Sequence, residues 1–399
     1  MELIEQNAKL TIIAAVCGLL PVITGQAAAK PLKVFILAGQ SNMEGPANIK
    51  TFDYIGDDPK TAPMLKEMVG ADGKPVVCDH AWLSYLTGDP NFEVTGRMTA
   101  GYGSMAGMDR TKPGDKIGPE FTFGIYMSKV VHEPFLIIKT AWGGKSLHTD
   151  FRPPSAGPQP LHDYIKAKFG HDAEKVQQEE DKRLGVFYRY MIEHVRKVLA
   201  DLPRVVPGCD PKQGYELAGF VWLQGWNDYC DSWWYPAEWG DKRYDEYARL
   251  MALFIGDVRK DLAAPKMPFV IGVAGFGGLN AGKDMQYFRK AMAAPTLMPE
   301  FKGNVVAVET APFWDDQLEV LQKRMESCWS KVDAKVKEEK NDSWDNKMKV
   351  MAENFTPDEW KRLMRGASNA GYHYLGCAKT FALMGKAFAG ALVNLDKSK

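Results

Sequence analysis

A serine that follows a buried apolar run is the first residue of this sequence that could act as a nucleophile. Ser41 stands in the segment GQSNMEG, directly after the apolar run at residues 32–38. A serine at a helix start after a tight glycine turn is exposed at a sheet edge, where backbone N–H groups can stabilise an oxyanion. The spacing from Ser41 to Glu44 also fits a Ser-x-x-Glu capping box, so a purely structural serine is the alternative.

A nucleophilic serine needs a base, and one of the seven histidines stands apart from the others. His373 lies on a glycine-containing loop, immediately before the last amphipathic segment, and such a loop can bring an imidazole to a serine far away in sequence. His194 falls on an apolar helical stripe and is expected to be packed. His148 follows a Gly-Gly turn and could line a site. No H-E-x-x-H or paired C-x-x-C segment occurs, so no metal is expected.

Two further turns carry groups that could stabilise an oxyanion. Gly143 and Gly144 follow the apolar run at 134–141, and a backbone N–H there can approach a substrate oxygen that a side chain would obstruct. Gln224 ends the run at 217–224, and its amide could donate a second hydrogen bond. Each feature has a structural alternative, because glycine pairs are common in turns and a buried amide can satisfy loop backbone groups.

The elements that must position these residues are short and apolar. Runs without polar alternation predict strands buried on both faces, and therefore a parallel sheet, at residues 32–38, 134–141, 217–224, 268–275 and 304–310. Amphipathic patterns predict helices at residues 184–199, 244–262 and 374–393. Strands that alternate with helices indicate βαβ units in an α/β fold, a three-layer α/β/α sandwich whose ligand site lies at the carboxyl ends of the strands.

The net charge and the N-terminal segment indicate which binding partners and which compartment to expect. Lys and Arg number 50 and Asp and Glu number 50, and this neutral balance argues against binding nucleic acid or an anionic membrane by bulk electrostatics. Residues 1–29 join Lys9, an apolar run and an Ala27-x-Ala29 pattern, so we expect the signal peptide of a periplasmic or extracellular protein. An uncleaved N-terminal anchor is the alternative. Residues 30–399 are expected to form one domain, with insertions near 46–116, 150–180 and 315–362.

Cysteine usage gives one further expectation. Without Cys17, which lies in the expected signal peptide, five of the six cysteines remain. An odd number in an exported chain leaves at least one thiol unpaired. A chain of this length does not need covalent staples to fold, so no dense disulfide framework is expected.

Four segments together resemble a known family. The segments VFILAGQSNMEG, KTAWGGKSL, VWLQGWND and NAGYHYLG are similar to the spaced blocks of SGNH-type hydrolases. Within these, they look most like the branch that holds carbohydrate esterase family 6 and the sialate O-acetylesterase-like domain. The resemblance runs from residue 33 to about residue 390. It implies the flavodoxin-like form of the sandwich and removal of O-linked acetyl groups from sugars, without a metal or organic cofactor.

The resemblance also implies a role for each matching residue. Ser41 would be the nucleophile and His373 the general base. The oxyanion hole would consist of the backbone N–H groups of Ser41 and of Gly143 or Gly144, together with the Gln224 side chain. Substrate contacts are expected from the residues beside these blocks, namely Gln40, Asn42, Trp226, Asn227 and His148.

The sequence departs from the family pattern at two places. The family often has an aspartate three residues before its histidine, where this chain has Ala370. Relatives also often read Gln-Gly-Glu after the third strand, where this chain has Trp226 in place of the glutamate. The acid that orients His373 is therefore unidentified. Asp228 is the first candidate, followed by Glu309, Asp315 and Asp316.

Residues 222–239 are unusually rich in aromatic side chains, which suit the apolar faces of sugar rings. They include Trp222, Trp226, Tyr229, Trp233, Trp234, Tyr235 and Trp239. An acetylated carbohydrate is therefore the expected substrate. The missing aspartate leaves an alternative, a carbohydrate-binding protein with weak or no catalysis on an esterase-like scaffold. An esterase for lipid esters is a third interpretation, although no lid-like apolar helix flanks the blocks.

Overall fold

The computed structural model describes residues 30–89, 91–105, 109 and 112–397. The segment expected to be a signal peptide or anchor, residues 1–29, lies outside the described residues. Among the helices that are described, none has the length and apolar character required to cross a membrane.

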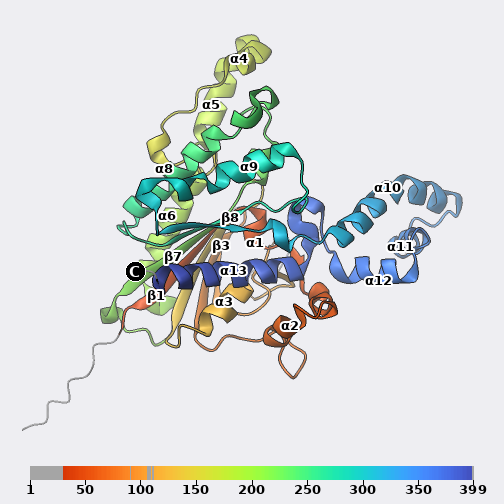
Figure 1. Cartoon of the computed structure of the whole chain (residues 1–399), viewed down its shortest axis with the longest axis horizontal. Coiled ribbons are helices and arrows are strands. Elements are labelled where there is room, and N and C mark those ends of the chain that lie inside the picture. Colours follow the sequence, from red (N-terminus) through yellow and green to blue (C-terminus); the bar gives the residue numbers. More distant parts are fainter. Residues whose placement is uncertain (1–29, 90, 106–108, 110–111, 398–399) are drawn as a thin grey trace, which may run out of the picture.

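A seven-stranded sheet forms the centre of the molecule (Figure 1), with the strand order β4-β3-β6-β1-β7-β8-β9. Its strands are β1 (Leu32–Gly39), β3 (Ala81–Thr87), β4 (Phe92–Arg97), β6 (Phe135–Ala141), β7 (Tyr215–Leu223), β8 (Phe269–Val273) and β9 (Val305–Glu309). Every neighbouring pair is parallel except β3 and β4. The prediction of a parallel sheet is confirmed, and all five predicted strands are present.

Part of the segment expected to be an insertion, residues 46–116, belongs to the central sheet. It supplies β3 and the antiparallel edge strand β4. Interpreting the whole segment as an insertion is therefore wrong. The strand β3 could not be predicted because it contains buried polar residues. Ser84 is fully buried and forms hydrogen bonds with Glu93 of β4 (2.8 Å) and His194 (2.9 Å). These long-range partners satisfy a polar group that breaks the apolar pattern. The same segment begins a two-stranded sheet of β2 (Ala47–Asn48) and β5 (Lys116–Ile117).

Helices cover both faces of the sheet, which confirms the three-layer sandwich (Figure 1). One face carries α3 (Glu120–Ser128) and α13 (Ala378–Lys397), and the other carries α6 (Val186–Ala200), α8 (Asp245–Asp261) and α9 (Lys283–Ala293). The predicted amphipathic helices correspond to α6, α8 and α13. Shorter helices lie at the strand ends and edges: α1 (Ser41–Glu44), α2 (Ala62–Met68) and α7 (Trp226–Cys230).

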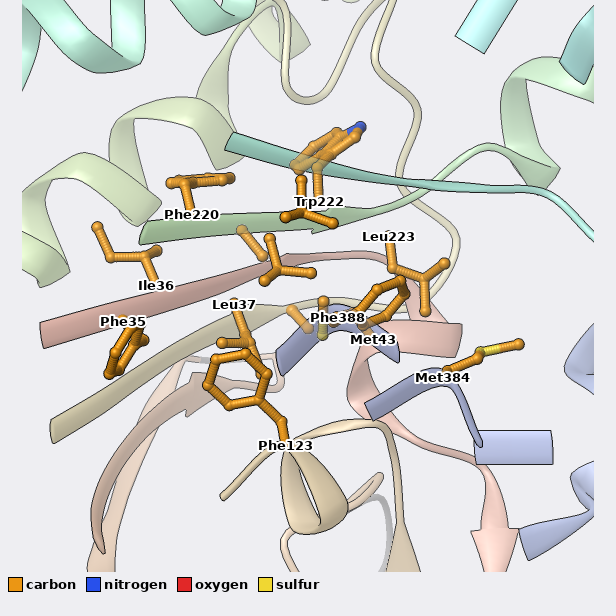
Figure 2. Packing of buried hydrophobic residues seen from close by; sticks show 14 of the residues in the cluster. Phe35, Ile36, Leu37, Met43, Phe123, Phe220, Trp222, Leu223, Met384 and Phe388 are labelled. Carbon is orange, nitrogen blue, oxygen red and sulfur yellow. The ribbon is translucent and has the colours of Figure 1, made fainter. Parts of the chain in front are cut away.

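The core consists of side chains that alternate between the two faces of the strands. Figure 2 shows Phe220 and Trp222 of β7 on one side of the strands and Phe35 and Phe123 on the other. Trp222 packs against Phe254 of α8 with ring centroids 4.4 Å apart, and Phe35 meets Phe123 of α3 edge to face at 5.6 Å. Each large side chain buried in this way contributes about 1.5–3 kcal/mol.

Two helical segments extend away from the sandwich (Figure 1). One holds α4 (Asp163–Phe169) and α5 (Ala173–Arg183), and the other holds α10 (Asp316–Glu338), α11 (Trp344–Ala352) and α12 (Pro357–Gly366). The second segment has a small core of its own, formed by Cys328, Val332, Val336, Val350 and Met351. The central strands therefore lie between the layers of the sandwich, whereas these helices extend beyond it.

Candidate active site

The carboxyl ends of β1, β6 and β7 meet at one edge of the sheet, because β1 pairs with both of the other strands. In open α/β sheets, ligands bind beyond the carboxyl ends of the strands, where the strand order reverses. Gly39 passes so close to β7 that an added Cβ would lie 2.0 Å from the Leu223 carbonyl oxygen. Only glycine fits there, and the chain then turns directly into α1 at Ser41.

Ser41 and His373 are in hydrogen-bond contact although 332 positions separate them, with Ser41 Oγ 2.9 Å from His373 Nε2. His373 lies in the 3₁₀ segment Gly371–Gly376, which packs against α1. The capping-box interpretation of Ser41 is wrong, because α1 has no side-chain cap bond. The Glu44 carboxylate accepts a hydrogen bond from Thr87 Oγ1 instead (2.9 Å).

The second ring nitrogen of His373 contacts an amide. His373 Nδ1 lies 2.9 Å from Asn369 Oδ1, and the backbone N–H of Ala370 donates to the same oxygen at 2.8 Å. Because the Ala370 N–H can only donate, the Asn369 atom that faces it must be the oxygen. Because this oxygen can only accept a hydrogen bond, Nδ1 of His373 must carry the proton. Nε2 is therefore the unprotonated nitrogen, and it accepts the hydrogen bond of the Ser41 hydroxyl.

The surroundings of His373 favour a neutral imidazole. Burial lowers the pKa of His373 to about 4, and the positive charge of Lys116 acts in the same direction. No carboxylate in the described part of the chain contacts the ring to oppose these effects. The ring is therefore an unprotonated base at neutral pH, with its lone pair directed at Ser41 Oγ.

Asp228 does not orient His373, so this expectation is wrong. The Asp228 carboxylate is fully buried and accepts hydrogen bonds from the backbone N–H groups of Leu147 (2.8 Å) and His148 (3.1 Å) and from Tyr235 Oη (3.1 Å). Burial raises its pKa, and the hydrogen bonds oppose that effect. Its oxygens are thus occupied in holding the loop after β6 against the loop after β7. The other acids that were considered also make no contact with His373: Glu309, Asp315 and Asp316.

Gln224 is also occupied, contrary to the expectation that its amide faces the substrate. Its Nε2 donates to Asp228 Oδ2 at 2.6 Å and to the Lys145 carbonyl oxygen at 3.1 Å. The amide that lines the cleft beside Ser41 belongs to Asn227. Gln40 Nε2 donates to Asn227 Oδ1 at 2.9 Å. Within the described chain Asn227 Nδ2 has no protein acceptor, so this amide, rather than Gln224, is available as a side-chain donor.

Two backbone N–H groups complete the donor set at the cleft. The Ser41 N–H belongs to the first turn of α1, where an amide has no partner within the helix. Gly144 lines the cleft in a left-handed conformation with φ +73°, and an added Cβ would meet no atom within 4 Å. The Gly143 N–H is directed to the Glu44 carboxylate. Of the two predicted glycines, Gly144 is thus the one with an available N–H.

The cleft around Ser41 and His373 has a volume of about 370 Å³. One wall is aromatic, because Trp226 stacks on Tyr372 with ring centroids 5.7 Å apart and an interplanar angle of 26°. Its further lining comes from several loops and includes Gln40, Glu44, Pro46, Ser104, Lys116, Gly143, Gly144, Asn227 and Asn369. The cleft thus combines an aromatic wall with polar side chains.

Two predicted substrate contacts lie elsewhere. Asn42 is buried beneath the cleft, where its Nδ2 donates to the Tyr372 carbonyl oxygen at 3.1 Å and ties α1 to the histidine loop. His148 lines a neighbouring cavity and lies 3.0 Å from Asp231 Oδ2. Gln40, Trp226 and Asn227 do line the cleft. The Asn42 side chain thus supports the loops around the cleft, whereas the His148 side chain belongs to the neighbouring cavity.

Among the residues of the site that were not predicted, three are close to the reacting groups or the aromatic wall: Asn369, Tyr372 and Lys116. Asn369 stands four residues before His373, whereas the family often has its aspartate three residues before the histidine. Tyr372 is adjacent to the histidine, and its stacking on Trp226 depends on two loops meeting. Lys116 comes from a segment interpreted as insertion, and no local pattern marks it as part of a site.

The sequence matches the family model described as carbohydrate esterase, sialic acid-specific acetylesterase over residues 31–320. This range includes Ser41, Gly144 and Asn227 but ends before Asn369 and His373. A comparison with curated proteins gave no match.

A comparison with solved structures found several to which the chain is similar, and three of them follow. A protein from Arabidopsis thaliana is 17% identical, with 70% of this chain and 86% of that chain covered and a TM-score of 0.38. A carbohydrate acetylesterase from Xanthomonas citri is 13% identical, with 71% and 51% covered and a TM-score of 0.38. NanS is 12% identical, with 93% and 100% covered and a TM-score of 0.46. Since the family match spans most of the chain, the chain belongs to the carbohydrate esterases described as sialic acid-specific acetylesterases, and it is a carbohydrate O-acetylesterase.

Proposed function

We propose that this esterase removes O-acetyl groups from carbohydrates through a covalent acyl-enzyme, with Ser41 as the nucleophile and His373 as the general base. The observation that carries this proposal is the 2.9 Å contact between Ser41 Oγ and His373 Nε2, together with the tautomer that Asn369 imposes. A serine hydroxyl is a weak nucleophile, and a neutral imidazole within hydrogen-bond reach is the group that activates it.

In the first step, His373 Nε2 takes the hydroxyl proton as Ser41 Oγ attacks the acetyl carbonyl carbon. The resulting oxyanion accepts hydrogen bonds from the N–H groups of Ser41 and Gly144 and from Asn227 Nδ2. One such donor typically contributes about 3–4 kcal/mol to the stability of the transition state. The bond from the acyl carbon to the sugar oxygen then breaks, and His373 gives its proton to that oxygen.

In the second step, His373 takes a proton from water, and the hydroxide oxygen attacks the acetyl-serine. The same donors stabilise the second oxyanion. Collapse of this intermediate breaks the bond to Ser41 Oγ, which recovers the proton from His373 and releases acetate. Asn369 acts through His373 as a positioning residue, because it holds the ring without touching the substrate.

The Ser41→Ala substitution tests the proposed nucleophile. We expect it to abolish release of acetate from p-nitrophenyl acetate and acetylated xylan, while circular dichroism and the melting temperature stay close to those of the wild type. Ser104→Ala is the matched control, because Ser104 also lines the cleft but makes no side-chain contact with His373. Full activity of Ser41→Ala would exclude the proposed mechanism.

Covalent labelling separates an active esterase from a protein that only binds carbohydrate. A serine-directed organophosphonate should label the wild type at Ser41, and peptide mass spectrometry should locate the adduct there. No adduct is expected on Ser41→Ala. A wild type that binds sugars but takes up no label would instead support the non-catalytic alternative.

A further inference from the structure

A second cavity adjoins the cleft at Ser41. It has a volume of about 490 Å³, and it shares Gly144 and Asn227 with the first cleft. We name it the Trp233 pocket, and it is defined by Asp150, Glu180, Arg183, Asp231, Trp233 and Trp234. An added Cβ on Gly144 would meet no atom within 4 Å, so this shared residue faces open space.

The Trp233 pocket combines an aromatic face with fixed polar groups. Trp233 is 41% exposed, and Phe169, which does not line the pocket, supports its ring edge to face at 5.4 Å. Asp231 Oδ1 accepts hydrogen bonds from the backbone N–H groups of Trp233 (3.0 Å) and Trp234 (3.1 Å). Its other oxygen lies 3.0 Å from His148 Nε2. The carboxylate is therefore held in place before any ligand arrives.

Another part of the lining comes from α5, in the segment that extends from the sandwich. Arg183 Nη1 donates to Glu180 at 2.8 Å, and Arg183 Nη2 lies 3.6 Å from Asp150. Planar carboxylate and guanidinium groups bind pairs of hydroxyl groups, and an indole face packs against the C–H groups of a pyranose ring. This combination of groups is suited to a sugar.

The charge of the pocket decides which kind of sugar fits. Three carboxylates, those of Asp150, Glu180 and Asp231, line it with the Arg183 guanidinium, and a further cation beside its aromatic face is the Lys168 ammonium, 4.7 Å from the Trp233 ring centroid. This excess of negative charge repels a sugar that carries its own carboxylate, as sialic and uronic acids do, whereas neutral hydroxyl groups can donate hydrogen bonds to the carboxylates.

We propose that the Trp233 pocket binds a neutral sugar residue next to the acetylated one, in an oligosaccharide or polysaccharide whose chain crosses Gly144. The inference rests on the proposed function of the Ser41 cleft, because it assigns the acetylated residue to that cleft. The segment with α4 and α5 thereby gains a function, since it supplies one wall of the pocket.

Binding to the full chain in the Ser41→Ala background tests the pocket without hydrolysis. Isothermal titration calorimetry with xylotetraose, cellotetraose and mannotetraose should detect binding of at least one. The anionic probe tetragalacturonate, which carries a carboxylate on every sugar residue, should bind at least tenfold more weakly. Equal or tighter binding of tetragalacturonate, or no binding of any neutral tetrasaccharide, would overturn the proposal.

Substitution of the indole locates that binding. Trp233→Ala should weaken binding of the neutral tetrasaccharide about tenfold, and Trp233→Phe, which keeps an aromatic face, should retain most of it. Trp344→Ala is the matched control, because Trp344 is an exposed indole on α11 outside both cavities. If Trp233→Ala binds as tightly as its parent, the pocket is not the subsite. Hydrolysis that survives Ser41→Ala would refute the proposed function alone, since binding is measured separately.

Discussion

At the scale of single residues, an amide takes the place beside the histidine that a carboxylate occupies in Ser-His-Asp triads. Asn369 Oδ1 fixes the tautomer of His373 as a carboxylate would, because it accepts the Nδ1 proton at 2.9 Å. A neutral amide brings no charge to stabilise an imidazolium. The site therefore retains the orienting part of the acid's role and lacks its electrostatic part.

The pH profile should reveal this difference. Burial lowers the pKa of His373 to about 4, and the neutral ring is the proposed base, so activity should fall only as the pH drops toward 4. Asn369→Asp places a negative charge beside Nδ1 and stabilises the protonated ring. We expect the acidic limb of kcat/KM to move upward by about one to three pH units. An acidic limb that stays where it is in the wild type would contradict this role for Asn369.

Asp228 should behave as a structural carboxylate. In Asp228→Asn, one carboxylate oxygen becomes an NH₂ group, and the backbone N–H that faces it, of Leu147 or of His148, loses its acceptor in a buried site. We expect the free energy of unfolding to fall by about 1–3 kcal/mol, measured by urea denaturation. The acidic limb of kcat/KM should stay near that of the wild type. An upward or downward shift of that limb with full stability would instead indicate that Asp228 acts on His373.

At the scale of elements, the loop that carries His373 is held in an uncommon backbone conformation. Tyr374 and Leu375 have φ angles of +49° and +61°, although neither is glycine. The buried Tyr374 hydroxyl accepts a hydrogen bond from the Gly275 N–H at 2.8 Å and lies 2.8 Å from Thr310 Oγ1. This anchor on the ends of β8 and β9 compensates for the strained backbone and keeps the neighbouring imidazole at Ser41.

Removing the anchor should affect both stability and turnover. Tyr374→Phe leaves the buried Gly275 N–H without its acceptor, at a cost of about 1–3 kcal/mol in the free energy of unfolding. We also expect kcat to fall more than KM rises, because the loop holds the base rather than the substrate. Tyr215→Phe is the control, because Tyr215 of β7 is exposed, and it should change neither quantity. Wild-type kcat in Tyr374→Phe would show that the loop keeps its conformation unaided.

At the scale of the whole molecule, a continuous core supports the site while the extending helices depend on much less packing. The central strands are buried between helices on both faces. The outer part of α10 and all of α11 rest on a separate cluster that includes Val332, Val350 and Met351. Stability should therefore differ between these parts, because local opening costs less where fewer apolar contacts break.

Hydrogen exchange measures that difference. Under native conditions, amides in residues 328–352 should exchange through local opening at a lower free energy than amides in β1. The central strands should exchange only near the global free energy of unfolding. Mass spectrometry of peptides from both regions provides the comparison, with residues 269–273 of β8 as a second internal reference. Equal protection in both regions would mean that the whole described chain opens as one cooperative unit.

The fold was predictable from the sequence to the extent that burial follows local pattern. Strands buried on both faces read as uninterrupted apolar runs, so five strands and the helices α6, α8 and α13 could be located. β3 and β4 could not, because Ser84 and Glu93 are polar and gain their partners only across the sheet. A polar group buried by a long-range hydrogen bond leaves no local signal.

The sequence by itself determined which residues could react. The glycine turn before Ser41, the loop histidine at 373 and the glycine pair at 143–144 are local features, and chemistry limits what such residue types can do. Only the tertiary structure decided which groups serve that chemistry. Asn369 rather than Asp228 holds the imidazole, and Asn227 rather than Gln224 faces the cleft. The reason is that hydrogen-bond partners are assigned by competition among all nearby donors and acceptors, and those neighbours exist only once distant segments have folded together.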